Sequence, residues 1–219
     1  MTLSTEHFDF FFDDADISWA QRFSELAEET VKKVSGELGI SPDIERQEFY
    51  ICPDVKSFIR LTNRTEEDYQ TWMVGWANRD LRRICLLSPR VVTDRPPDAM
   101  EKIAVHETVH IVFDQLADPE RMPAWISEGA AVLYADQTEP QYIDENNCPS
   151  IFDISGDDFA ENGGYDYSGV YVWYFIKCFG MASFKELYRG EYRENWYRTG
   201  FEAQAVKEYK RDKLNSEEK

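Results

Sequence analysis

Residues 106 to 110 read His-Glu-Thr-Val-His, and this stretch limits the local fold more strongly than any other part of the chain. Two of the three histidines of the protein lie here, four residues apart, a spacing that puts both on one face of an α-helix. Pro96-Pro97 ends the preceding segment, and Asp98 with Glu101 predicts an N-cap and a capping box. We expect a buried helix, because most of its positions are apolar. These positions are Met100, Ile103, Val105, Val109, Ile111, Val112 and Phe113.

Such a helix gives His106, Glu107 and His110 a shared chemistry. The two imidazoles can bind one metal ion, and Glu107 lies beside them, where it can move protons. A zinc ion would lower the pKa of a water to about 7 and polarise a scissile carbonyl. Glu107 would take the proton of that water and pass it to the leaving amine. The alternative is that both histidines are hydrogen-bonded core residues, which would leave Glu107 buried without a partner.

A catalytic zinc usually takes three protein ligands, so a third ligand is expected elsewhere in the chain. Pro123 followed by good helix formers predicts a second helix that reaches Tyr134. Glu128 is its one ionisable side chain before Tyr134, and it lies on an apolar face with Trp125, Ala131, Val132 and Ala135. A carboxylate there needs a metal, a hydrogen-bond network or a salt bridge. We expect the metal, with Gly129 letting the two helices approach closely. An Arg or Lys partner from the core is the alternative.

Together the two motifs resemble the gluzincin metallopeptidases, and most closely their compact peptidase MA-like branch. His-Glu-x-x-His at 106–110 is followed by Pro-x-Trp-Ile-x-Glu-Gly-x-Ala at 123–131. The resemblance implies a Zn²⁺ site made by His106, His110 and Glu128. It also implies an α+β fold of the two-lobed zincin-like type, with the metal helix between the lobes.

The sequence departs from this family's pattern at the residue that would orient the histidines. Metal-bound histidines usually donate their second ring N–H to a carboxylate or a carbonyl. In thermolysin-like enzymes that carboxylate lies one turn after the ligand glutamate, and this position is Val132 here. Asp114, Asp136 or a backbone carbonyl would have to take its role.

The resemblance also implies a tyrosine near the start of a later helix. Its hydroxyl would donate a hydrogen bond to the oxyanion of the transition state. Residues 165–175 read Tyr-Asp-Tyr-Ser-Gly-Val-Tyr-Val-Trp-Tyr-Phe, similar to the Tyr-x-x-Gly stretch that opens an apolar helix in aminopeptidase-type gluzincins. Tyr167 matches the oxyanion donor, and Tyr171, one turn further along the same face, is the second candidate. Because the chain has 12 tyrosines, ordinary aromatic core packing is the alternative.

Two apolar, β-prone segments before the metal helix predict a hairpin. They are Thr71–Asn78 and Arg83–Ser88, with a turn at Arg79-Asp80. In the family, the strand at this place is an exposed sheet edge that binds the substrate backbone. The matching residues are Gly75, Trp76, Ala77 and Asn78. They lack the glutamate of the Gly-x-Met-Glu-Asn signature, which speaks against aminopeptidase specificity, and a purely structural hairpin is the alternative.

The rest of the chain predicts strands and helices around these motifs. Strands are expected at His7–Phe12 and Gln47–Cys52, a helix at Ser18–Leu38 that ends at Gly39, and a short helix at Asp54–Leu61. We therefore expect residues 1–219 to form a single catalytic domain, with a strand-containing lobe at 1–95 and a helical lobe at 96–219.

Composition limits the setting and the partners. The net charge of -18 argues against nucleic acid, whose phosphates would be repelled. No apolar run approaches the roughly 20 residues of a membrane helix, and the N-terminus lacks the pattern of a signal peptide. We expect a cytoplasmic protein with no membrane partner, whose partner is a peptide or unfolded-protein substrate.

Two classes of function follow from these residues. The first is a zinc metallopeptidase, an endopeptidase with Glu107 as its general base. The second is a catalytically silent or self-blocked gluzincin-fold module for binding or regulation. Retention of Glu107 favours the first class, since a structural metal site has no use for a general base. Hydrolysis of a non-peptide amide or ester by the same chemistry is a third alternative.

Overall fold

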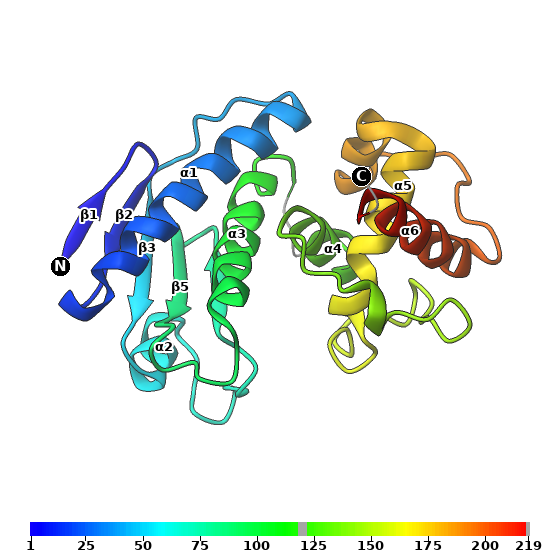
Figure 1. Ribbon diagram of the computed structural model, residues 1–219. Coiled ribbons are helices and arrows are strands. Elements are labelled where there is room, and N and C mark those ends of the chain that lie inside the picture. Colours follow the sequence, from blue (N-terminus) through cyan, green and yellow to red (C-terminus); the bar gives the residue numbers. More distant parts are fainter. Residues whose placement is uncertain (118–121, 218–219) are drawn as a thin grey trace. The chain divides into compact units, whose positions relative to one another are not determined.

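The computed structural model describes residues 1–117 and 122–217 (Figure 1). The chain divides into two compact units, Met1–Gln115 and Leu116–Lys219. Helices and one mixed sheet make this an α+β protein, as the sequence predicted. No helix in the described parts of the chain is long and apolar enough to cross a membrane.

The first unit is built on a sheet of mixed direction with the strand order β1-β2-β3-β5-β4. Its strands are β1 (Thr2–Ser4), β2 (Phe8–Phe11), β3 (Gln47–Cys52), β4 (Gly75–Asn78) and β5 (Arg83–Leu87). The two central pairings, β2 with β3 and β3 with β5, are parallel, and the outer strands β1 and β4 are antiparallel to their neighbours. The predicted hairpin is thus β4–β5, with β4 as the outermost strand. The strand β1 was not predicted.

Three helices pack on this sheet. They are α1 (Ile17–Leu38), α2 (Val55–Leu61) and α3 (Pro97–Phe113). Phe23 of α1 packs on Phe49 of β3 with ring centroids 6.2 Å apart, and α1 lies beside α3 (Figure 1). The helix α1 ends as predicted, because Gly39 takes a left-handed conformation with φ 62°.

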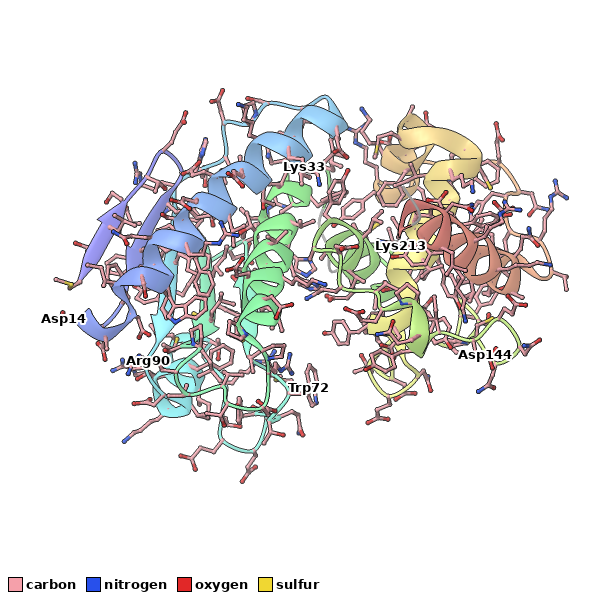
Figure 2. The ribbon with its side chains drawn as sticks, in the orientation of Figure 1. Asp14, Lys33, Trp72, Arg90, Asp144 and Lys213 are labelled. Atoms are coloured by element: carbon pink, nitrogen blue, oxygen red, sulfur yellow. The ribbon has the colours of Figure 1, made fainter. Side chains whose placement is uncertain are left out.

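A buried ion pair joins the start of α1 to the segment after β5. Asp16 accepts hydrogen bonds from Ser88 Oγ at 2.6 Å and from Arg90 Nε at 2.7 Å and Nη2 at 2.8 Å. Arg90 is labelled in Figure 2, near Asp14 and the start of α1. Asp16 is fully buried, so its charge needs these three donors.

The predicted helix around the histidines is confirmed, but its predicted capping box is wrong. The N-cap of α3 is Pro96, without a side-chain cap, and Asp98 lies inside the first turn. Glu101 does not turn back toward the helix start, because its Oε2 accepts from Arg22 Nη2 of α1 at 2.7 Å. A partner far away in sequence therefore takes the carboxylate that the local pattern had assigned to the cap.

The second unit consists mainly of α4 (Ala124–Tyr134), α5 (Gly164–Tyr188) and α6 (Phe201–Glu217). The helix α5 is interrupted at Gly180, where φ is 83° and ψ is 164°. The helices α4 and α5 make the most extensive contact in this unit. The helix α6 buries one apolar face. That face contains Phe201, Ala205, Val206 and Tyr209.

The boundary between the units lies later in the chain than the predicted division at residue 95. The whole of α3 belongs to the first unit, because it packs on α1 and on β4. Residues 96–115 are therefore part of the strand-containing unit and not of the helical one. The predicted metal-binding histidines share a unit with the predicted substrate-binding strand.

Candidate metal centre

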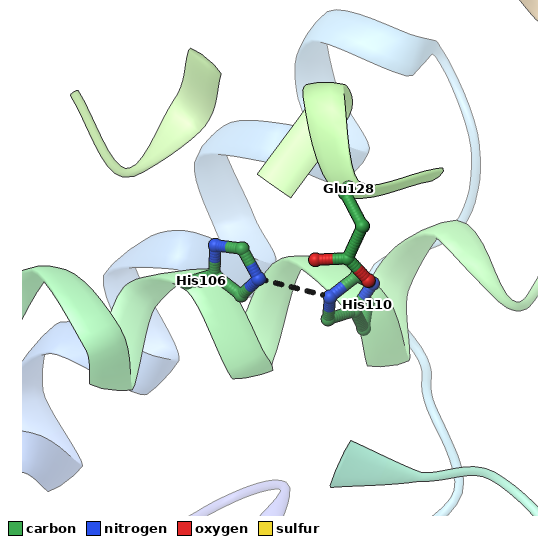
Figure 3. A group of neighbouring side chains, drawn as sticks. All are labelled: His106, His110 and Glu128. Atoms are coloured by element: carbon green, nitrogen blue, oxygen red, sulfur yellow. Dashed lines mark hydrogen bonds between the residues drawn. The ribbon is translucent and has the colours of Figure 1, made fainter. Parts of the chain in front are cut away.

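The two histidines of α3 converge on one point. His106 and His110 lie one helical turn apart, and their Nε2 atoms are 3.1 Å from each other (Figure 3). Two nitrogen ligands of a tetrahedral zinc, each about 2.0–2.1 Å from the metal, lie about 3.3–3.4 Å apart. The same two atoms that form the hydrogen bond drawn in Figure 3 are thus spaced to share a metal ion. The histidine pair fits zinc in both donor type and separation.

Glu107 lies on the adjacent side of α3, against the edge of the sheet. Its side chain is buried, as are those of His106 and Ile103. A Cβ atom placed on Gly75 of β4 would lie only 2.5 Å from Oε1 of Glu107 and 2.6 Å from Cγ2 of Ile103. The carboxylate therefore rests directly on the backbone of β4.

The outer edge of β4 offers backbone groups for pairing. Leu87 N–H donates to the carbonyl of Val74 at 2.8 Å, and the register pairs Gly75 with Leu86 and Ala77 with Ile84. Hydrogen-bonded and non-hydrogen-bonded pairs alternate in an antiparallel ladder. Gly75 and Ala77 consequently point their N–H and C=O groups away from β5. Among the described residues, β4 pairs with no other strand.

The other two predicted residues of this strand play different parts. Side chains alternate along a strand, so Trp76 and Asn78 lie on the face opposite Glu107. Asn78 Oδ1 accepts from Leu81 N–H at 2.8 Å and so stabilises the hairpin turn. Of the four predicted substrate-binding residues, Gly75 and Ala77 have the backbone placement that a paired strand requires.

The predicted third ligand, Glu128, comes from α4 and is half-buried (labelled in Figure 3). Its neighbour Gly129 was expected to allow a close approach to the histidine helix. A Cβ on Gly129 would instead lie 2.7 Å from the carbonyl oxygen of Ser168 and 2.8 Å from Val172, both in α5. Gly129 therefore serves the contact between α4 and α5, which brings the backbone next to Glu128 against the backbone next to Tyr167.

The two candidate tyrosines differ in the hydrogen bonds that their hydroxyl groups make. Tyr171 is fully buried, burial raises the pKa of its hydroxyl, and this hydroxyl donates to the carbonyl of Pro149 at 2.7 Å. The hydroxyl of Tyr167 accepts a hydrogen bond from Asp144 N–H at 3.0 Å. Its own proton can still be donated to a ligand. Of the two tyrosines, Tyr167 is thus the one whose hydroxyl accepts, and Tyr171 the one whose hydroxyl already donates.

The carboxylates considered for orienting the histidines also differ. Asp136 Oδ1 binds Lys213 Nζ at 2.8 Å within the second unit. Asp114 is buried at the C-terminal end of α3, one turn after His110. Val132 is fully buried and packs closely on Gly169 of α5, since a Cβ on Gly169 would lie 2.6 Å from its Cγ1. A carboxylate at position 132 would therefore be buried and costly. Of the two aspartates, Asp114 is therefore the buried one and the one in the same unit as the histidines.

A second group of possible metal ligands lies in the first unit at Glu6, His7 and Glu28. Here Glu28 Oε2 is 2.6 Å from Nδ1 of His7, and Glu28 Oε1 accepts from the backbone N–H of His7 at 2.8 Å. Both oxygens of Glu28 already hold the start of β2 against α1. These contacts make the group a structural clamp between the start of β2 and α1.

No protein-family model matches this chain, and no curated protein sequence matches it. The functional assignment therefore depends on the motifs and on the geometry within each unit.

Proposed function

We propose that this protein is a zinc-dependent metallopeptidase of the two-lobed zincin type, acting as an endopeptidase on peptides or unfolded proteins. The observation that supports this most directly is the 3.1 Å separation of the His106 and His110 Nε2 atoms, beside the buried carboxylate of Glu107. A purely structural histidine pair does not require a carboxylate at that place. A general base for hydrolysis does.

The proposed zinc ligands are His106, His110 and Glu128. When bound, zinc would lower the pKa of a water to about 7 and polarise the scissile carbonyl. Glu128 is proposed because it is the one carboxylate of α4 and because two imidazoles with one carboxylate form a common catalytic ligand set. Asp114 is proposed to orient a ligand histidine.

Glu107 and Tyr167 carry the proton and charge steps of the proposed reaction. Glu107 accepts a proton as the water oxygen bonds to the carbonyl carbon, and it donates that proton to the leaving nitrogen as the C–N bond breaks. Tyr167 donates a hydrogen bond to the oxygen on which negative charge develops. Its position at the start of α5, with its hydroxyl proton still available, supports this role.

Substrate is proposed to bind as an added strand along β4. The outward N–H and C=O groups of Gly75 and Ala77 would pair with an extended backbone, which selects for peptides and unfolded segments whatever their side chains. No glutamate at Gly75–Asn78 reads a free amine, which favours an endopeptidase. The net charge of -18 disfavours nucleic acid as a partner.

Elemental analysis combined with a cleavage assay tests this proposal. We expect about one zinc per wild-type chain, loss of zinc in His106→Ala and Glu128→Ala, and unchanged zinc in the exposed control Glu161→Ala. Mass spectrometry of a digested unstructured protein should show internal cleavage sites. Zinc without any cleavage would favour the silent binding module, and no zinc in the wild type would contradict the proposal.

A further inference from the structure

Position 75 requires glycine because neighbouring side chains fill the place of a Cβ atom, and not because of its backbone conformation. Its φ is not positive, so an L-amino acid could adopt the same conformation. The position where a Cβ would stand is instead taken by Oε1 of Glu107 at 2.5 Å and Cγ2 of Ile103 at 2.6 Å, with Leu86 at 3.1 Å. Even the smallest side chain would collide with α3.

We propose that Gly75 is a positioning residue for Glu107, which places the carboxylate against the strand that receives the substrate backbone. This inference depends on the proposed role of Glu107 as general base. Cγ2 of Ile103 is bonded directly to its Cβ and can move little, whereas Oε1 of Glu107 is the far end of a side chain with three rotatable bonds. A methyl group at position 75 would therefore displace the carboxylate first.

The size of that displacement follows from the contact distance. Relaxing the 2.5 Å contact to an ordinary van der Waals separation requires a shift of about 1 Å. A misplacement of about 1 Å can reduce the rate roughly 100-fold. Alanine at position 75 keeps the outward N–H and C=O groups of β4. The turnover number should fall while substrate binding is largely retained.

The activity test compares Gly75→Ala with Gly36→Ala. Gly36 lies in α1 of the same unit, and nothing lies within 4 Å of its added Cβ, so the same substitution is harmless there. Gly75→Ala should keep its zinc and show a kcat about 10- to 100-fold lower on an unstructured protein, with KM within about threefold of wild type. A kcat within about threefold of wild type in Gly75→Ala would overturn the proposal.

A double-mutant cycle in urea unfolding tests the contact without any need for activity. Gly75→Ala should lower the unfolding midpoint in the wild-type background and lower it clearly less in the Glu107→Ala background. Ile103 and Leu86 are present in both backgrounds, so their effects cancel. Equal shifts would overturn the proposal whether or not the wild type cleaves protein. Absence of wild-type cleavage together with unequal shifts would refute the proposed function alone.

The cycle also covers a variant that does not fold. If Gly75→Ala alone is unfolded, the comparison is made in an Ile103→Ala background, which removes the second close contact. There the double variant Gly75→Ala/Glu107→Ala should be more stable than Gly75→Ala, because it also lacks the carboxylate that collides with the methyl group. A double variant no more stable than Gly75→Ala in that background would overturn the proposal.

Discussion

A single alanine at Gly129 should have the opposite effect on stability from the same change at Gly36. Both glycines lie within helices, and replacing a helical glycine with alanine normally stabilises by about 0.5–1 kcal/mol. Gly36 has open space around it, so it should show this gain. At Gly129 the new Cβ would lie 2.7 Å from the carbonyl oxygen of Ser168 and 2.8 Å from Val172.

The cost at Gly129 can be estimated from these contacts. Overpacking a core costs about 1–3 kcal/mol, and the upper half of that range applies here because a backbone atom of α5 cannot rotate away. Subtracting the helix-propensity gain of about 1 kcal/mol leaves a net loss of about 1–2 kcal/mol. Gly129→Ala should therefore destabilise and Gly36→Ala should stabilise.

Urea unfolding followed by circular dichroism measures both changes. Equal m-values would confirm that the two variants differ in stability and not in the extent of unfolding. A Gly129→Ala variant as stable as Gly36→Ala would refute the close contact between α4 and α5. That contact holds the backbone beside Glu128 against the backbone beside Tyr167, so its loss would also weaken the proposed site.

Other substitutions test single groups in the two units. Tyr167→Phe should keep zinc and lower kcat about 100- to 1000-fold, whereas Tyr171→Phe should leave kcat near the wild-type value and lower the unfolding free energy by about 1 kcal/mol. Glu202→Ala should cost about 1–3 kcal/mol in urea unfolding, because the buried N–H of Ile151 loses its acceptor. Burial alone would raise the pKa of Asp16, but hydrogen bonds from a guanidinium and a hydroxyl leave that pKa lowered. Its stabilising effect is therefore complete above the unfolded pKa of about 3.9 and is lost as the pH falls through the folded value, so Asp16→Asn should flatten the acid side of the stability profile. Unchanged kcat in Tyr167→Phe, unchanged stability in Glu202→Ala or an unchanged acid profile in Asp16→Asn would contradict the respective contact.

Elements with strong local signals were predictable from the sequence. The helix α1 has an amphipathic pattern and a glycine at its end, and β3 is a short β-prone run, so both were found within one residue of their bounds. The histidine helix was predictable from its largely apolar sequence after Pro96-Pro97. His106, Glu107 and His110 follow from spacing alone once that helix exists.

Features that depend on distant partners were not predictable. The carboxylate of Glu101 could have capped α3, but Arg22 of α1 binds it instead. The packing of Gly129 on α5 required knowledge of which helix lies beside α4. The role of Gly75 arises only because α3 crosses β4, and nothing in residues 71–78 themselves signals a carboxylate above that glycine.

Glu107→Gln gives the most direct test of the central claim, because it changes the general base and leaves both histidines in place. Zinc content and cleavage of an unstructured protein should be measured on the same preparations of wild type and variant. We predict about one zinc per chain in both proteins and cleavage in the wild type alone. Undiminished cleavage by Glu107→Gln, at equal zinc content, would contradict the account.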